Sequence, residues 1–315
     1  MVNVVTAADL VRDIVQRVLN EDAKANADFL PPTLLLRWIA DAYVEITRRT
    51  KLLTATHKTD LLPQGSQPAP DDILDRMVWH DRALRVMDNS GNWTALKERD
   101  WTYISKFYPL FDYSPSGNPV DWCWFEGKST PTILIVPTPS GITAGLFNLD
   151  YIQDPGPINR LYDDDTATAG VVQGDATVTF ASSISGLLLA GDVFGVKADK
   201  SSLPTKWYKI ASVSNSLHVE LTEVYAEVTD GTALFTTSQV SPLEWARPNL
   251  VRYAPSEYVL MKYWQGRAAD DTWSKYAQAF EGEIQRILMQ MNYRPGLKLQ
   301  GTDARKNYPA MRRYL

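Results

Sequence analysis

Apolar side chains recur at helical spacing near the start of the chain. Leu10, Ile14 and Val18 lie four positions apart and predict a helix from Ala7 to about Asn20. After a pair of prolines, which are well tolerated at a helix start, the same spacing predicts a second helix through residues 33–51. A short loop joins the two segments, so the sequence predicts an αα-hairpin.

Helical spacing returns near the end of the chain. Residues 256–269 and 271–291 are amphipathic segments that predict a pair of helices. No periodicity follows beyond Pro295, and the remaining residues predict an extended tail. The tail is basic, because a single aspartate, Asp303, stands against five cationic residues: Lys298, Arg305, Lys306, Arg312 and Arg313.

Alternating polarity and turn residues predict short strands between the two helical regions. Residues 82–96 predict a β-hairpin with its turn at residues 89–92, and residues 120–127 predict a further strand. Residues 97–108 predict a brief helix that stops before a proline. Residues 64–70, which are rich in Gly, Pro, Ser and Gln, predict a linker.

Two apolar runs follow one another in the middle of the chain. The first is Thr132–Val136, and the second extends from Leu146 to Ile152. Pro137, Pro139 and a glycine-rich segment separate them. Proline cannot donate to a sheet ladder, so the prolines predict the end of one strand and a reversal. The two runs therefore predict a hairpin at the edge of a β-meander.

The segment from residue 166 to residue 240 has a different pattern. It contains five short strand candidates divided by Gly, Asp, Asn and Ser, at residues 174–180, 191–197, 206–213, 217–221 and 231–237. Short strands at near-regular spacing are typical of a small β-barrel or sandwich.

The predicted fold class is α+β, in three consecutive regions. A helical hairpin plus β-meander occupies residues 1–165, and an inserted all-β barrel or sandwich occupies residues 166–240. The C-terminal helices and the extended basic tail occupy residues 241–315.

Composition narrows the possible functions. The net charge of −5 argues against broad coating of nucleic acid, which requires a positive field. Ten Trp and 15 Tyr are a surplus that fits either interfaces between chains or core packing. A single cysteine, Cys123, excludes an internal disulfide. With only three histidines, the chain has no set of Cys and His ligands for a zinc ion. The sequence predicts no signal peptide and no membrane span, and hence a cytosol-like compartment.

Few residue patterns point to chemistry. Gly127-Lys128-Ser129 imitates the end of a phosphate-binding loop, but Trp122 stands where the upstream glycine belongs, so a turn is predicted. The side chains of the adjacent residues Asp163, Asp164 and Asp165 point in different directions, whereas the ligands of a metal ion must converge. The three residues therefore predict a solvated acidic loop. The sequence therefore predicts no catalytic residue, no metal site and no cofactor, and the protein is expected not to be an enzyme.

Two segments resemble known phage proteins. The helical hairpin, the strands ending in ILIVPTPSGITAGLFNLDYI and the paired helices YVLMKYWQGRAADDTWSKYAQAFEGEIQRIL resemble tailed-phage head-to-tail adaptor proteins over roughly residues 1–160 and 245–315. The insert is similar to a β module widespread in phage virion proteins. Its matching motifs are Gly191-Asp192-Val193-Phe194 and Trp207–Val213.

The adaptor resemblance implies a structural virion protein of the neck. It implies a ring of identical chains, a dodecamer, that sits below the portal protein and extends the DNA channel. Tail or nozzle proteins are the further partners, genomic DNA passes during ejection with only transient, non-specific contact, and no membrane is involved. Such a protein is made in the host cytoplasm.

The C-terminal tail is the predicted portal-binding site. A segment that is disordered when free and ordered on a partner loses conformational entropy on binding, so apolar anchors are needed in addition to charge. The predicted contacts are Leu297, Leu299, Arg305, Lys306, Tyr308, Met311, Arg312, Arg313, Tyr314 and Leu315.

Two other functions remain open from the sequence. One is a different phage tail or baseplate structural protein. The other is a carbohydrate-binding module, in which Trp207 and Tyr208 of the β insert would form an aromatic platform.

Overall fold

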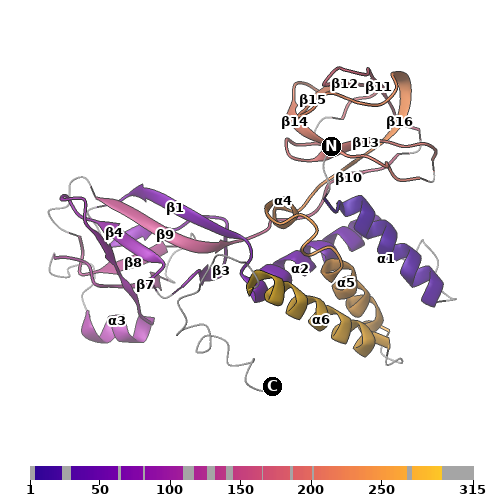
Figure 1. Ribbon diagram of the computed structural model, residues 1–315. Coiled ribbons are helices and arrows are strands. Elements are labelled where there is room, and N and C mark those ends of the chain that lie inside the picture. The colour runs from indigo at the N-terminus through magenta and orange to yellow at the C-terminus, as the bar shows by residue number, and fades with distance from the viewer. Residues whose placement is uncertain are drawn as a thin grey trace.

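The protein consists of a helical bundle, a β-sandwich and a β-barrel (Figure 1). The sandwich and the barrel extend from the bundle in different directions. This computed structural model describes residues 4–22, 30–62, 65–80, 82–108, 117–125, 132–139, 145–164, 166–184, 187–200, 202–267 and 272–292.

The bundle combines helices from both ends of the chain. Its members are α1 (Ala7–Glu21), α2 (Pro32–Thr50), α5 (Ala254–Gln265) and α6 (Thr272–Asn292). Thr6 and Asp9 form a capping box at the start of α1, which satisfies amide groups that lack a partner in the helix. Leu10, Ile14 and Val18 are buried in the shared core, which confirms the predicted apolar stripe of α1.

The predicted αα-hairpin is confirmed only in part. Both helices form, but α2 packs chiefly on α5, and α5 packs on α6. The N-terminal pair therefore has no core of its own and completes one bundle with the C-terminal pair. A short helix, α4 (Pro242–Ala246), precedes α5 and has no counterpart in the predicted elements.

Two sheets pack face to face in the sandwich. One has the order β1-β9-β4-β5, with β3 also paired to β9: β1 (Thr54–Asp60), β9 (Leu146–Gln153), β4 (Leu84–Met87), β5 (Trp93–Ala95) and β3 (Ile73–Val78). The other has the order β2-β8-β7-β6: β2 (Ser66–Pro68), β8 (Thr132–Val136), β7 (Asp121–Phe125) and β6 (Lys97–Glu98). Leu84, Phe147 and Leu149 of the first sheet share a core with Trp122 and Ile133 of the second.

The predicted hairpin of Thr132–Val136 with Leu146–Ile152 is wrong. Both strands form, as β8 and β9, but they belong to different sheets. The reason is burial: all five residues of β8 are buried, and a strand covered on both faces reads as a continuous apolar run.

The predicted linker at residues 64–70 is also wrong. Its residues 66–68 form β2, which pairs with β8. Gln67 is fully buried, and its side-chain amide bonds both the N–H and the C=O of Leu62. The brief helix α3 (Trp101–Phe107), the strand β7 and the β4–β5 hairpin are confirmed.

The seven remaining strands build the barrel. They are β10 (Leu161–Tyr162), β11 (Thr168–Val171), β12 (Thr177–Phe180), β13 (Val193–Val196), β14 (Tyr208–Val213), β15 (His218–Leu221) and β16 (Asp230–Ser238). The barrel closes because β16 pairs with both β11 and β13. All five strands predicted here form, and Phe180, Phe194 and Phe235 fill the interior.

Candidate functional site

The N-terminal segment connects the bundle to the barrel. The Ala7 N–H donates to the Gln239 carbonyl at 3.0 Å, and the Ala8 N–H donates to Ser238 Oγ at 3.0 Å. Val4 and Ala8 also pack against Trp207 of the barrel. The first turn of α1 is thereby attached to the end of β16, far along the sequence.

Gln239 joins the two points at which the chain enters and leaves the barrel. Its Nε2 donates to the Pro157 carbonyl at 2.8 Å, and its Oε1 accepts from the N–H groups of Asn159 and Arg160 at 3.0 and 3.3 Å. Arg160 in turn donates to both carboxylate oxygens of the buried Asp192, at 2.8 and 3.0 Å. Bidentate pairs of this kind fix orientation as well as contributing energy.

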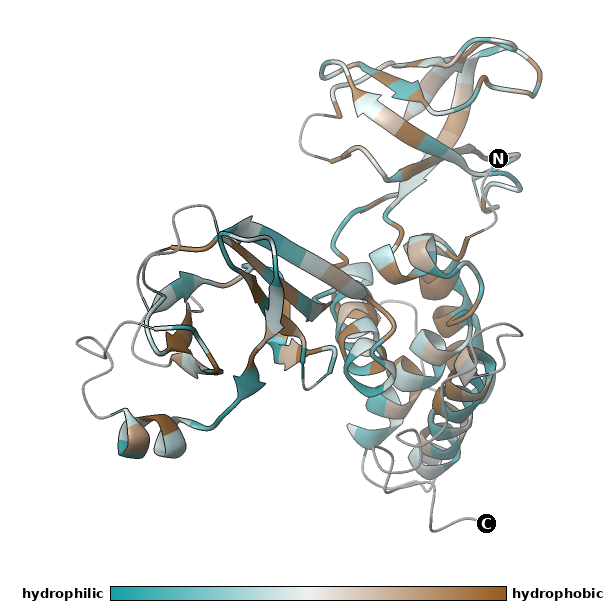
Figure 2. Cartoon of the chain, turned by 60° about the vertical axis from the view of Figure 1, so that its left-hand side comes forward, coloured by the Kyte–Doolittle hydropathy of each residue, from teal (hydrophilic) through white to brown (hydrophobic). Residues whose placement is uncertain are grey.

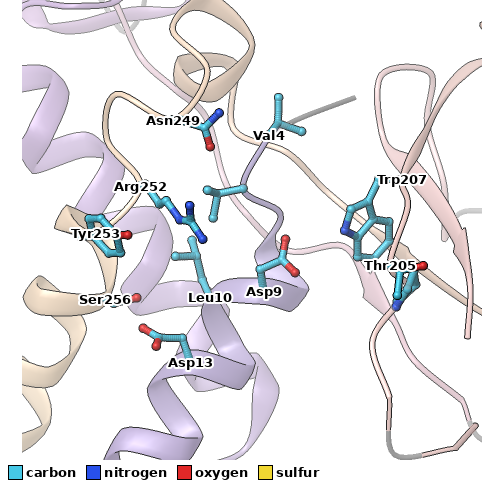
Figure 3. A pocket seen from close by; sticks show the side chains of 12 residues that line it. Val4, Asp9, Leu10, Asp13, Thr205, Trp207, Asn249, Arg252, Tyr253 and Ser256 are labelled. Carbon is cyan, nitrogen blue, oxygen red and sulfur yellow. The ribbon is translucent and has the colours of Figure 1, made fainter. Parts of the chain in front are cut away.

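A groove of about 420 Å³ lies where the N-terminal segment, the bundle and the barrel meet (Figure 3). Asp9 and Asp13 of α1 line one wall, and Trp207 lines the other. Arg252 and Tyr253, which precede α5, close the end, with the guanidinium 5.4 Å from the ring centroid. The groove holds charges of both signs, and Asp9 is already engaged in the capping box of α1. The lining of the groove therefore combines charged, hydroxyl and apolar side chains.

Glu244 of α4 is a buried carboxyl group near this groove. Burial raises its pKa to about 7, although the N–H groups of Asn249 and Val5 donate to it and oppose that shift. Its Oε1 has no hydrogen-bond partner among the described atoms. Glu244 therefore ties the N-terminal segment to the loop before α5, at an energetic cost whenever it is ionised.

The remaining candidate residues do not converge on one site. Within the described ranges, no group of three or more His, Cys, Asp or Glu side chains could hold a metal ion. Asp163 accepts from buried Lys197 at 2.8 Å and from Thr236, and Asp164 caps its own turn through Thr166. None of the helices described is long and apolar enough to cross a membrane.

The two tryptophans of β7 face one side of the sheet and Cys123 faces the other, as expected for alternating residues of a strand. Trp122 and Trp124 pack in the core between the two sheets, whereas Cys123 packs with Ile104 of α3. Burial raises the pKa of the Cys123 thiol to about 11, so the residue is an inert space-filling group.

The aromatic surplus is divided between core and surface. Trp122, Trp207 and Trp264 are buried, whereas four tryptophans are exposed: Trp79, Trp93, Trp101 and Trp273. The carbohydrate platform predicted at Trp207 and Tyr208 is wrong, because both rings are buried. Trp207 packs towards the N-terminal segment and Tyr208 packs inside the barrel.

Several predicted features lie outside the described residues. They are the Gly127-Lys128-Ser129 turn, Asp165 and every predicted portal-binding residue of the tail: Leu297, Leu299, Arg305, Lys306, Tyr308, Met311, Arg312, Arg313, Tyr314 and Leu315.

Comparison with known families identifies the class of protein. The model of the SU10 adaptor protein family matches residues 5–175, more than half of the chain, from the N-terminal segment through β11. The chain belongs to this family, which is one of phage structural adaptors. No curated protein matches the chain.

Sequence reasoning missed the residues that join the three parts. Gln239, Ser238 and Glu244 are polar residues beside a strand end and a short helix, where polar side chains are ordinary. Their partners in the N-terminal segment lie 230 or more positions away, as for Ala8 and Ser238. The Ser241-Pro242 pair, which is typical of a helix start, is a local signal that could have indicated α4.

Proposed function

We propose that this chain is a head-to-tail adaptor that forms a ring beneath the portal protein of a tailed phage. The match to the SU10 adaptor protein family over residues 5–175 carries this proposal. In that role the ring lengthens the DNA channel and presents the surface on which tail or nozzle proteins assemble. The task requires packing surfaces and no catalysis, so the protein acts as a structural component and not as an enzyme.

The three parts have different roles in this proposal. The bundle and the sandwich form the adaptor body, and residues 166–240 form a separate β module on the periphery or the tail-facing side. In support, the chain enters and leaves the barrel side by side, since Leu161 lies opposite Ser238. A module connected in this way can project outward without interrupting the body.

Contact with genomic DNA is weak and non-specific in this proposal. The channel wall must let the genome pass, and a net charge of −5 provides no general attraction for phosphate groups. Tight, sequence-dependent binding in a gel-shift assay at physiological salt would contradict it.

The tail from Pro295 to Leu315 is proposed as the portal-binding segment. Its apolar anchors include Leu297, Leu299, Tyr308 and Met311, and its charge suits an acidic groove on the partner. Apolar anchors buried at the centre of an interface contribute more than exposed charges, which are screened by salt.

The experiment that tests this function is docking on purified portal rings, measured by sedimentation. The full chain is expected to co-sediment in a ring-matched ratio, and a chain truncated after Met291 is expected to stay folded but to lose stable docking. Arg312→Ala with Arg313→Ala serves as the comparison and should weaken docking less than joint replacement of Tyr308, Met311, Tyr314 and Leu315. Failure of the full chain to bind any portal would contradict the adaptor function.

A further inference from the structure

One side of the β1 main chain has no partner among the described residues. β1 pairs only with β9, in a register that runs without a bulge from Thr54 opposite Ile152 to Asp60 opposite Leu146. The strand lies along the edge of the sandwich and is largely hydrophilic (Figure 2). Natural proteins usually protect such an edge, because its free N–H and C=O groups invite another strand.

The hydrogen bonds at both ends of β1 show which residues face outward. The Gln153 N–H donates to the Leu53 carbonyl at 2.9 Å, and the Leu61 N–H donates to the Gly145 carbonyl at 2.9 Å. Bonded and non-bonded pairs alternate along an antiparallel ladder, so the odd-numbered residues bond to β9. The even-numbered residues therefore turn their N–H and C=O groups to the open edge, and their side chains are exposed: Thr54, Thr56, Lys58 and Asp60.

The opposite edge of the same sheet is also open. In the β4–β5 hairpin the Leu96 N–H donates to Leu84 and the Asp88 N–H donates to Asn92, at 2.9 and 3.0 Å. The same alternation leaves the main chain of Trp93 and Ala95 facing outward. Trp93 is 43% exposed, and all three residues of β5 are exposed.

We propose that β1 of one copy pairs with β5 of the next copy, so that this sheet continues from chain to chain around the ring. The inference rests on the proposed function, which places identical copies side by side. Two different edges on opposite sides of one sheet make a heterologous contact, and repetition of such a contact closes a ring when the rotation between copies divides a full turn. The β1 edge has four outward residues and no proline or bulge, so it accepts a strand without rearrangement.

Side chains on the two edges are compatible with this pairing. Lys58 lies opposite Asn148, Asn148 opposite Arg85, and Arg85 opposite Ala95, so these residues share one face of the sheet. Trp93 shares that face, since it lies two positions from Ala95. In a continued sheet the Lys58 ammonium of one copy lies near the Trp93 ring of the next, which is a favourable cation–π pair.

The test compares two substitutions at one outward position. Thr56→Pro removes an N–H that faces the open edge and leaves every β1–β9 hydrogen bond in place. Thr56→Val is the matched control, because it keeps the N–H and loses the same hydroxyl bond to Asp150 that proline loses. Thr56→Pro is expected to weaken self-association about tenfold, the effect of one or two lost hydrogen bonds, while Thr56→Val assembles like the parent.

Hydrogen–deuterium exchange of the unmodified chain gives a second readout, independent of how the proline variant folds. Amides in β1 and β5 are expected to exchange about tenfold or more slowly in the assembled ring than in the monomer. Two results would overturn the edge pairing and leave the adaptor function standing. One is a ring in which the amides of both edges exchange as fast as in the monomer. The other is a Thr56→Pro variant that folds and assembles like the parent. A chain that remains monomeric both alone and on portal rings would overturn the edge pairing and the adaptor function together.

Discussion

Arg160 holds Asp192 through two hydrogen bonds of 2.8 and 3.0 Å, across the point where the chain enters the barrel. Asp192 is almost fully buried, and its Oδ2 also accepts from the Leu189 N–H. The pair therefore fixes the β12–β13 connection to the segment that leads from β9 of the sandwich into β10. Removal of the Arg160 side chain would leave the buried carboxylate of Asp192 without its cationic partner.

Arg160→Ala is expected to destabilise the barrel by about 3 kcal/mol, the typical cost of breaking a buried ion pair from one side. Urea unfolding followed by circular dichroism and by the combined fluorescence of the ten tryptophans measures this. Lys275→Ala is the control, because Lys275 pairs with Glu21 at the surface and should cost less than about 1 kcal/mol. Equal effects of the two substitutions would contradict the role given to Arg160.

Gly195 is expected to tolerate no side chain. A Cβ atom at this position would lie 2.4 Å from Pro204 Cβ and 2.7 Å from the Lys206 carbonyl oxygen, so the backbone itself would have to move. Gly195→Ala should cost about 3 kcal/mol in unfolding free energy, as overpacking does. Gly231→Ala in β16 is the matched control, since a Cβ there meets nothing within 4 Å, and it should change stability little. A thermal melt of both variants decides between these outcomes.

Glu244 is expected to make the protein less stable as pH rises towards neutrality. Its pKa in the folded chain is about 7, against an ordinary value of 4.5, so the folded state holds the proton more tightly than the unfolded state does. The stabilisation is complete below about pH 4.5 and is lost as pH rises through 7. The full difference amounts to about 3 kcal/mol, at roughly 1.4 kcal/mol per pKa unit.

Glu244→Gln, which mimics the protonated side chain, should remove this pH dependence and raise stability at pH 8 relative to the parent. Unfolding free energies measured at several pH values between 5 and 8 test the expectation. Glu283→Gln on α6 is the control, because its carboxylate pairs with Arg286 near the surface. A parent protein whose stability stays flat or rises over this range would argue against the assignment.

The barrel is expected to be removable. Tyr162 and Thr237 lie directly opposite each other in the β10–β16 pair, so a two-residue turn can replace residues 163–236. The shortened chain should keep its helical circular dichroism signal, because the bundle core contains no barrel residue beyond the partly buried Leu161 of the retained β10. Collapse of the helical signal would show that the barrel is required for folding of the body.

The sequence predicts local elements well and their pairing poorly. Leu10, Ile14 and Val18 define the buried stripe of α1 from local spacing alone, and the same holds for the five predicted barrel strands. The predicted hairpin of β8 and β9 is wrong because an apolar run that is buried on both faces does not indicate which strands lie beside it in the sheet.

The sequence does not predict the strand β1, for the opposite reason. Its burial alternates only between exposed and half-buried, so the polar sequence from Thr54 to Asp60 carries almost no strand signal. Long-range polar contacts such as Ala8 with Ser238 leave no local pattern either. The adaptor class, by contrast, was visible in the order of elements along the chain, and the family match over residues 5–175 supports that class.

The most direct test of the account is cryo-electron microscopy of the neck of the virion that contains this chain. The adaptor proposal predicts a closed ring of identical copies between the portal and the tail, with twelve-fold symmetry and with the barrel on the periphery or facing the tail. A position anywhere else in the particle, or a density that holds no ring of this chain at the portal–tail junction, would contradict it.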